Sequence, residues 1–263
     1  MDVHEPALPV DPRLPGEPTV AEVGAARMWL GRRGVSVWLP TRLLALRIGS
    51  REWATRTLPW FVVAFGAATA ASSAFRQVPG RLGAVFVVAA VLQVVRWREV
   101  HRREDVAERL AGTGAPPALR EAARQVGWWY LAATTITFGG GAALCATTIV
   151  VAPSFDAFAQ TFALAVGAGA TAAVLGRILR APVIAEDPTS YAVDGLLRGQ
   201  DAYRYAPPAL FAMVAMPLAA VDWLSPGLLG WSASAYLALA GGAHLIGWLV
   251  ARRRKLPAGF YGR

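Results

Sequence analysis

The sequence predicts an all-α fold, a polytopic membrane helix bundle with six transmembrane helices. The chain of 263 residues is 55% hydrophobic, with a mean hydropathy of +0.40. Only 16% of its residues are charged, whereas soluble domains contain about 25%. The apolar residues form long blocks between arginine-rich stretches, and a membrane-spanning helix needs about 20 such residues. These observations exclude an ordinary soluble enzyme, a disordered protein and a disulfide-rich scaffold.

A polar segment, residues 1–57, comes first and is expected in the cytoplasm. Thr19 and Glu22 have the spacing of a capping box, which predicts a helix from Val20 to about Gly31. Residues 40–57 mix leucines with arginines. This composition favours an interfacial helix that lies on the inner leaflet before the first span. An irregular linker is the alternative.

Six apolar blocks are candidates for membrane spans. The second is the shortest, and it could also be tilted or form a re-entrant hairpin with the first. Tryptophan and tyrosine cluster at block ends, where amphipathic rings favour the headgroup level. The blocks cover residues 58–75, 82–97, 128–152, 158–176, 208–223 and 229–251.

The basic residues predict the orientation of these spans. Of 26 basic residues, 24 lie in the N-terminal segment, in the second connection together with Arg96 at the end of the second block, in the fourth connection, and in the C-terminal tail 252–263. The other two are Arg76 and Arg81, in the first connection. The positive-inside rule therefore predicts a multi-pass protein of the bacterial cytoplasmic membrane, with both termini cytoplasmic and short extracytoplasmic loops. Because this rule also explains the net charge of +9, no nucleic-acid partner is expected.

Amphipathic cytoplasmic helices are expected in the two long basic connections. The second span is expected to continue into water, followed by a short helix at about 117–126. In the fourth connection Asp187 can cap a helix whose first residue is Pro188. Helical spacing places Asp194, Arg198 and Asp201 on one face. With Asp187 they are candidates for coupling to a cytoplasmic partner, and a solvated loop helix is the alternative.

The apolar blocks themselves contain few chemical groups. No acidic residue falls in the expected hydrocarbon core, which argues against transport coupled to ions through buried carboxylates. Gly139, Gly140 and Gly141 indicate either close helix packing or a broken helix lining a pathway. His244 is a second candidate for packing or for a pathway. No catalytic motif is present, and a single cysteine with three distant histidines predicts no metal site and no cofactor.

Two resemblances accompany these patterns. On residues 186–204 and 38–44 the chain resembles six-span integral membrane proteins of high-GC actinobacteria, and the resemblance implies no catalytic residue. The layout of spans, surface helix and coupling segment is similar to membrane subunits of ABC-2 type exporters. The very short outer connections differ from many of those permeases.

The resulting functional hypothesis is a non-catalytic membrane subunit, related to transport or accessory to another assembly. Its expected partners are the lipid bilayer, a cytoplasmic ATPase or another membrane subunit, and a second copy of the chain in a homo-oligomer. The alternative is a membrane enzyme acting on lipid or a lipid-linked substrate at the inner leaflet. That enzyme would use Asp187, Asp194, Asp201 and His101, with arginines binding phosphate. A purely structural membrane protein with a closed interior is the third hypothesis.

Overall fold

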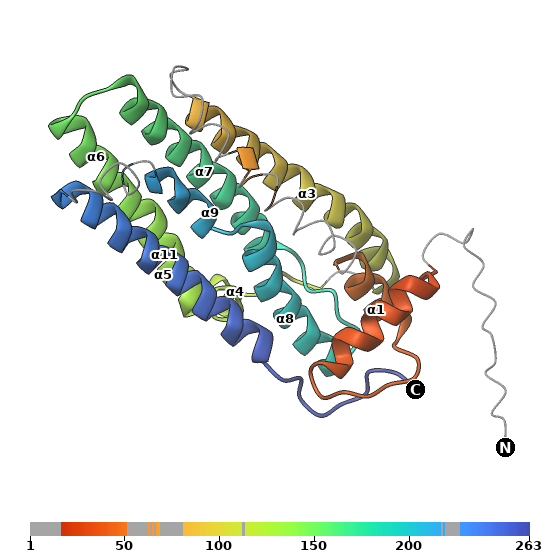
Figure 1. Ribbon diagram of the computed structural model, residues 1–263. Helices are drawn as coiled ribbons and strands as arrows, with labels where there is room; N and C mark the ends of the chain where they lie inside the picture. Colours follow the sequence, from red (N-terminus) through yellow and green to blue (C-terminus); the bar gives the residue numbers. More distant parts are fainter. Residues whose placement is uncertain are drawn as a thin grey trace.

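The computed structural model confirms an all-helical protein over the residues it describes. These are residues 17–51, 63, 65, 67–68, 81–111, 114–216, 218 and 227–263. Within them the chain forms helices and two isolated β-bridges but no strand. The long helices lie side by side along one direction, and the short helix α1 (Val20–Gly31) lies across one end of them (Figure 1).

Three helical stretches are long and apolar enough to cross a membrane. The first joins α5 (Trp128–Thr135), a turn of π-helix (Ile136–Gly140) and α6 (Gly141–Val151). The others are α7 (Phe155–Arg180) and α11 (Leu228–Arg253). At most 33% of their apolar windows is buried inside the protein, so most of this surface faces outward. Outward apolar surface of this extent indicates membrane association.

The count of six spans is not confirmed and stays a prediction. The block 82–97 lies in α3 (Arg81–Ala111), a single helix of 31 residues that is not among the three. The block 208–223 begins as α9 (Ala209–Ala212) and a 3₁₀ turn (Met213–Ala215). Its remainder lies largely outside the described residues, as does the block 58–75, of which positions 63, 65, 67 and 68 are helical.

The triple glycine does not break its helix. Instead the π-helical turn shifts the backbone register there, and the helix continues into α6. The hydroxyl of Tyr236 on α11 donates a hydrogen bond of 2.7 Å to the carbonyl of Thr137. A Cβ added at Gly141 would lie 2.8 Å from the Tyr236 hydroxyl oxygen and 2.9 Å from a methyl of Leu164. Two of the three glycines, Gly140 and Gly141, therefore serve close packing against Tyr236.

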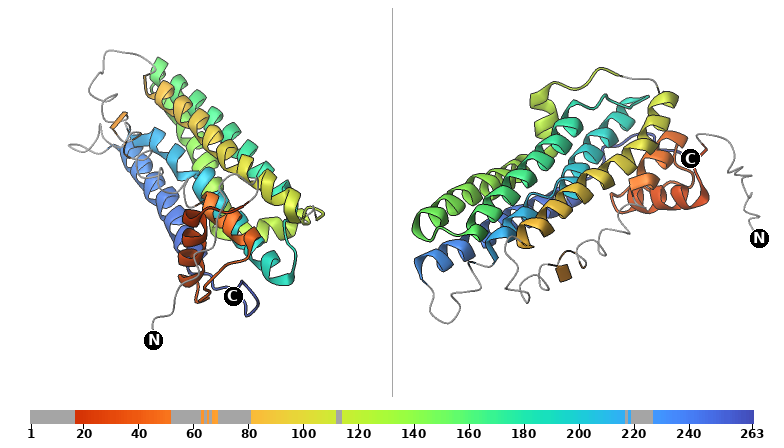
Figure 2. Two further views of the ribbon diagram at one scale, coloured as in Figure 1. Left: turned by 90° about the vertical axis from the view of Figure 1, so that its right-hand side faces the viewer. Right: turned by 90° about the horizontal axis from the view of Figure 1, so that it is seen from above.

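One end of the bundle carries the polar segments, and we call it the basic end. There α1, residues 42–51, α4 (Leu119–Val126) and α8 (Pro188–Tyr205) meet the C-terminal ends of α3, α7 and α11 (Figures 1 and 2). Both expected caps are present. Thr19 and Glu22 form a capping box, and Asp187 caps α8 by accepting from the Ser190 amide at 2.6 Å.

Residues 42–51 form the expected helix, but in a different environment. All residues from 43 to 51 are buried, and Leu44 and Ile48 pack with Trp29 and Val193. The C-terminal tail also joins this layer, through Tyr261 and a β-bridge between Pro40 and Gly262. This helix is therefore enclosed by protein within the described range, where the sequence favoured a helix resting on the inner leaflet; residues 52–57 lie outside the description.

Candidate functional site

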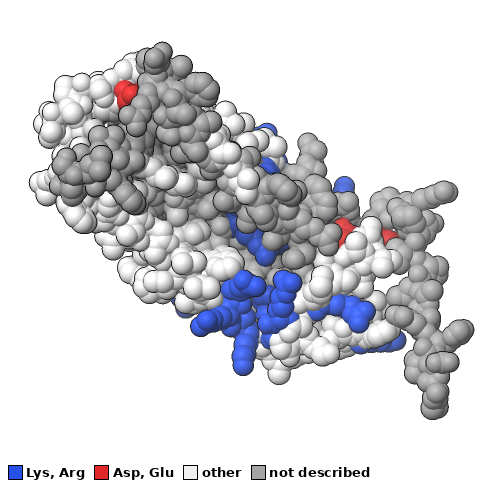
Figure 3. Space-filling model, viewed as in Figure 1, with Lys and Arg blue, Asp and Glu red and all other residues white. Residues whose placement is uncertain are grey.

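Two clusters of charged residues lie at the basic end, and they differ in their balance of charge. We call the first the ion network: Arg47, Arg51, Glu104, Asp194, Arg198 and Asp201. We call the second the basic pocket, which is lined by six cations and three aromatic side chains: Arg32, Arg33, Arg204, Arg252, Arg253, Lys255, Trp29, Tyr203 and Trp248. In the space-filling view lysine and arginine gather where the apolar bundle meets α1 (Figure 3).

The ion network centres on Arg51, whose guanidinium holds carboxylates from two other helices. Its Nε donates to Oδ1 and Oδ2 of Asp201 at 2.9 Å and 3.0 Å, and its Nη2 donates to Oδ2 at 2.6 Å. The same Nη2 also pairs with Glu104 on α3. Arg51 and Asp201 are 3% and 7% exposed, so this pairing is almost entirely desolvated. A bidentate contact between a guanidinium and a carboxylate fixes the relative orientation of the two side chains.

Arg47 and Arg198 complete the network around Asp194. Arg47 donates to one oxygen of Asp194 at 2.6 Å, and Arg198 donates to the other at 3.0 Å. Arg198 also donates to the carbonyl of Ala181, and Arg47 to the carbonyl of Ile184 at 2.8 Å. These bonds tie α8 to residues 42–51 and to the segment that follows α7.

Three arginines face three carboxylates, so the network is formally neutral. Burial alone would raise the pKa of Glu104, but the adjacent Arg51 and Arg47 and a hydrogen bond from His101 hold that pKa below its ordinary value. The hydrogen bond to Glu104 raises the pKa of His101. The cavity beside the network measures only about 40 Å³. It has room for about one water molecule rather than a substrate.

The charged face of α8 thus points into the protein. Asp194, Arg198 and Asp201 share a face as predicted, but all three are buried. Their role in coupling to a partner stays a prediction, and it would have to act through the ion network, because a partner cannot touch these side chains directly. Asp187 is engaged as the cap of α8.

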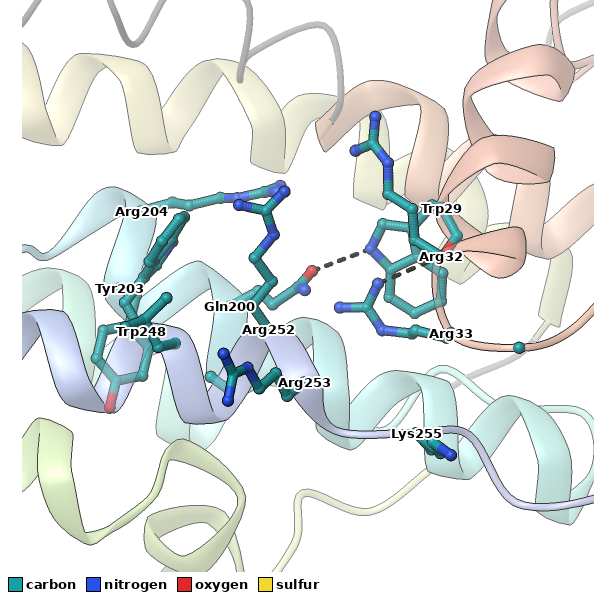
Figure 4. Close-up of a pocket in the computed structure, with 13 residues that line it drawn as sticks. Trp29, Arg32, Arg33, Gln200, Tyr203, Arg204, Trp248, Arg252, Arg253 and Lys255 are labelled. Carbon is teal, nitrogen blue, oxygen red and sulfur yellow. Dashed lines mark hydrogen bonds between the residues drawn. The ribbon is translucent and has the colours of Figure 1, made fainter.

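The basic pocket is larger than the cavity beside the ion network, and its described lining residues include cations but no carboxylate. Its volume is about 830 Å³, and its walls come from the end of α1, the C-terminal half of α8 and the end of α11 (Figure 4). No carboxylate, histidine, serine or cysteine is among the described residues that line it. Arg204, Arg252, Arg253 and Lys255 form no ion pair with any carboxylate in the described part of the chain.

Aromatic contacts hold the walls of the basic pocket. The Trp29 indole donates to Gln200 at 3.1 Å, the Arg33 guanidinium lies 3.7 Å above the Trp29 ring, and Arg252 lies 5.2 Å from the centre of Trp248 (Figure 4). Burial raises the pKa of Tyr203 to about 12, so its hydroxyl stays neutral. The pocket therefore combines aromatic rings with four cations that form no ion pair among the described residues.

The remaining predicted residues are the three glycines and His244, which belong to neither cluster. Gly139 to Gly141 pack in the first apolar helical stretch, as described above. His244 lies on α11 with its ring 5.4 Å from that of Tyr203, and its Nδ1 is buried without a hydrogen-bond partner in the described structure. No group of three or more His, Cys, Asp or Glu that could hold a metal ion occurs among the described residues.

Sequence reasoning missed Arg47, Arg51 and Glu104, as well as the basic pocket. One signal could have found the two arginines. Leu44, Arg47, Ile48 and Arg51 follow the i, i+3, i+4, i+7 spacing of a single helix face. An arginine inside an apolar stripe is expected to meet a buried carboxylate, since an unpaired buried charge is costly.

No protein-family model, no curated protein and no solved structure matches this chain. The ion network and the basic pocket are therefore the features from which a function can be inferred.

Proposed function

We propose that this protein is a non-catalytic integral membrane subunit, accessory to a transport or envelope assembly. The observation that carries the proposal is the ion network. It contains two carboxylates of the connection between α7 and α9, Asp194 and Asp201, which the enzyme hypothesis would have used as acid, base or nucleophile. Asp194 and Asp201 are both paired with arginines, and Asp187 caps a helix. Because these carboxylates bind arginines or cap a helix, they support a structural role for this connection rather than a catalytic one.

The proposal includes six spans with the basic end in the cytoplasm. The outward face of α3 supports a further span beyond the three, because Val88, Val91 and Val95 recur at helical spacing and are 57%, 56% and 53% exposed. The basic residues gathered at one end support the orientation. The segment between α6 and α7 is then extracytoplasmic.

A partner would meet the exposed first turn of α8. Glu186, Pro188 and Tyr191 face solvent there, next to a cap that rigidifies the turn. The ion network would transmit force from this turn to α3 and to residues 42–51. This arrangement is what a coupling element between a cytoplasmic protein and a membrane bundle requires. A coupling element of this kind also occurs in the membrane subunits of ABC-2 type exporters, and we include similarity to those subunits in the proposal.

Orientation is tested by labelling single cysteines in a Cys145→Ser background with a membrane-impermeant maleimide. Val20→Cys and Leu119→Cys, both at exposed positions, are expected to react only after permeabilisation. Pro153→Cys, between α6 and α7, is expected to react in intact cells. The reverse pattern would overturn the orientation.

The accessory role is tested by purifying the tagged full chain from its native membranes in mild detergent. We expect a partner in fixed ratio that is lost when Glu186→Arg and Tyr191→Asp are combined. The control variant Arg120→Glu changes charge at an exposed site on α4 and should retain the partner. A chain that purifies alone, or that converts lipid in vesicles without a partner, would refute the proposal.

A further inference from the structure

We propose that the basic pocket binds the phosphate-bearing headgroup of an anionic phospholipid. The inference goes beyond the accessory role and rests on one part of the proposed function, the insertion of the bundle in a membrane. Six cations converge there from three elements, and four of them make no ion pair within the described structure. Like charges gathered without counter-charges repel each other, so an anion bound among them stabilises the fold.

The contrast with the ion network supports this assignment. In the network each arginine faces a carboxylate of the same chain, whereas no carboxylate is among the described residues that line the pocket. The two clusters share α8, on which Asp201 faces the network while Gln200 and Arg204 line the pocket. The ion pairs of the network therefore do not explain why cations gather in the pocket.

The position of the pocket favours a lipid as the source of the phosphate. One wall is the last turns of α11, one of the three helices able to cross a membrane. Just before that wall, Leu245 and Ile246 are 54% and 43% exposed, so the outward apolar surface continues up to the pocket. Trp248 follows directly, and the guanidinium of Arg252 stands against its ring (Figure 4). A headgroup can enter while its acyl chains stay along α11.

The size of the pocket favours two phosphates over one. A volume of about 830 Å³ exceeds what a single phosphate needs, and the cations come from the turn after α1, from α8 and from the end of α11 with the residues that follow it. A lipid with two phosphates can contact more than one of these elements at once. We therefore expect diphosphatidylglycerol to bind more tightly than phosphatidylglycerol, and phosphatidylcholine least.

The test is native mass spectrometry of the full chain in neutral detergent, titrated with each of these three lipids. The variant Arg204→Gln/Arg252→Gln/Arg253→Gln removes three of the unpaired cations. At about fivefold in affinity for each charge, it should weaken binding of the anionic lipids on the order of 100-fold. Binding of phosphatidylcholine should not change.

The matched control removes three exposed arginines outside the pocket, Arg109→Gln/Arg120→Gln/Arg180→Gln. It has the same net charge as the first variant and should change binding less than about threefold. Equal losses in both variants would overturn the site, since they would indicate general attraction to anionic lipid. Sodium pyrophosphate is the soluble competitor. If pyrophosphate binds as tightly as the lipids and displaces them, the lipid assignment is wrong. A wild-type chain that purifies without any partner in the accessory test, while it still binds the anionic lipids at the basic pocket, would refute only the proposed function.

Discussion

Removing Arg51 is the most direct perturbation of the ion network. Its side chain is 3% exposed and donates to both Asp201 and Glu104. Arg51→Met keeps much of the volume but leaves the buried Asp201 and the partly buried Glu104 with one nearby cation fewer, so the network acquires a net negative charge. Breaking a buried pair by removing one partner costs about 3–5 kcal/mol. If Asp201 or Glu104 took up a proton, its charge would be neutralised, and the loss of folding free energy would be about 3 kcal/mol.

A second change should recover part of this loss. Arg51→Met/Asp201→Leu again has equal numbers of cations and carboxylates, with Arg47 and Arg198 facing Glu104 and Asp194. Replacement of a buried ion pair by apolar side chains of similar size is often neutral. We therefore expect the double variant to be more stable than Arg51→Met alone, by about 2 kcal/mol.

The assay is equilibrium unfolding of the purified protein in mixed detergent micelles, followed by circular dichroism. The wild type, both single variants and the double variant form one thermodynamic cycle. A loss below about 1 kcal/mol for Arg51→Met would show that the network contributes little. Strictly additive single losses would show that Arg51 and Asp201 do not act as a pair.

Three further perturbations test neighbouring features. The pKa of His101 is raised, so its contribution to the free energy of unfolding is present below pH of about 6.5 and is lost as the pH rises through the raised value. The variant His101→Gln should therefore show a smaller change of the unfolding midpoint with pH than the wild type. Gly141→Ala should cost about 1–3 kcal/mol by crowding Tyr236, whereas Gly139→Ala, with nothing within 4 Å, should be tolerated; equal thermal stability would contradict this packing. Asp187→Ala should cost about 0.5–2 kcal/mol by removing the cap of α8, and Asp187→Ser should restore most of it in the same melt.

The elements that the sequence predicted best are those with local signals. The apolar blocks at 128–152, 158–176 and 229–251 correspond to the three helices able to cross a membrane, since length and composition alone identify them. The cap at Thr19 and the start of α8 at Pro188 were likewise readable within four residues of chain. Each of these features depends only on its own segment.

The ion network could not be predicted in the same way, because its partners are distant in the chain. Arg51 and Asp201 are 150 residues apart. Periodicity shows that Asp194, Arg198 and Asp201 share a face, but it does not show whether that face meets water or opposite charge. Burial of residues 42–51 depends in turn on α8, so the helix that resembled a surface element is enclosed. The only local indication of this burial in the sequence is the apolar helix face that contains Arg47 and Arg51.

The two clusters are best understood together, because α8 belongs to both. Asp201 is held by Arg51 on one side of the helix, which sets the rotation of α8 about its axis. That rotation determines where Gln200 and Arg204 stand in the pocket wall. At Gly247 on α11 a Cβ would overlap the Tyr203 hydroxyl, so glycine there lets α8 approach α11 closely. The neutral network thus orients the helix that presents Arg204 to the basic pocket, so buried pairing of charge at one face of α8 supports the position of a cation at the other.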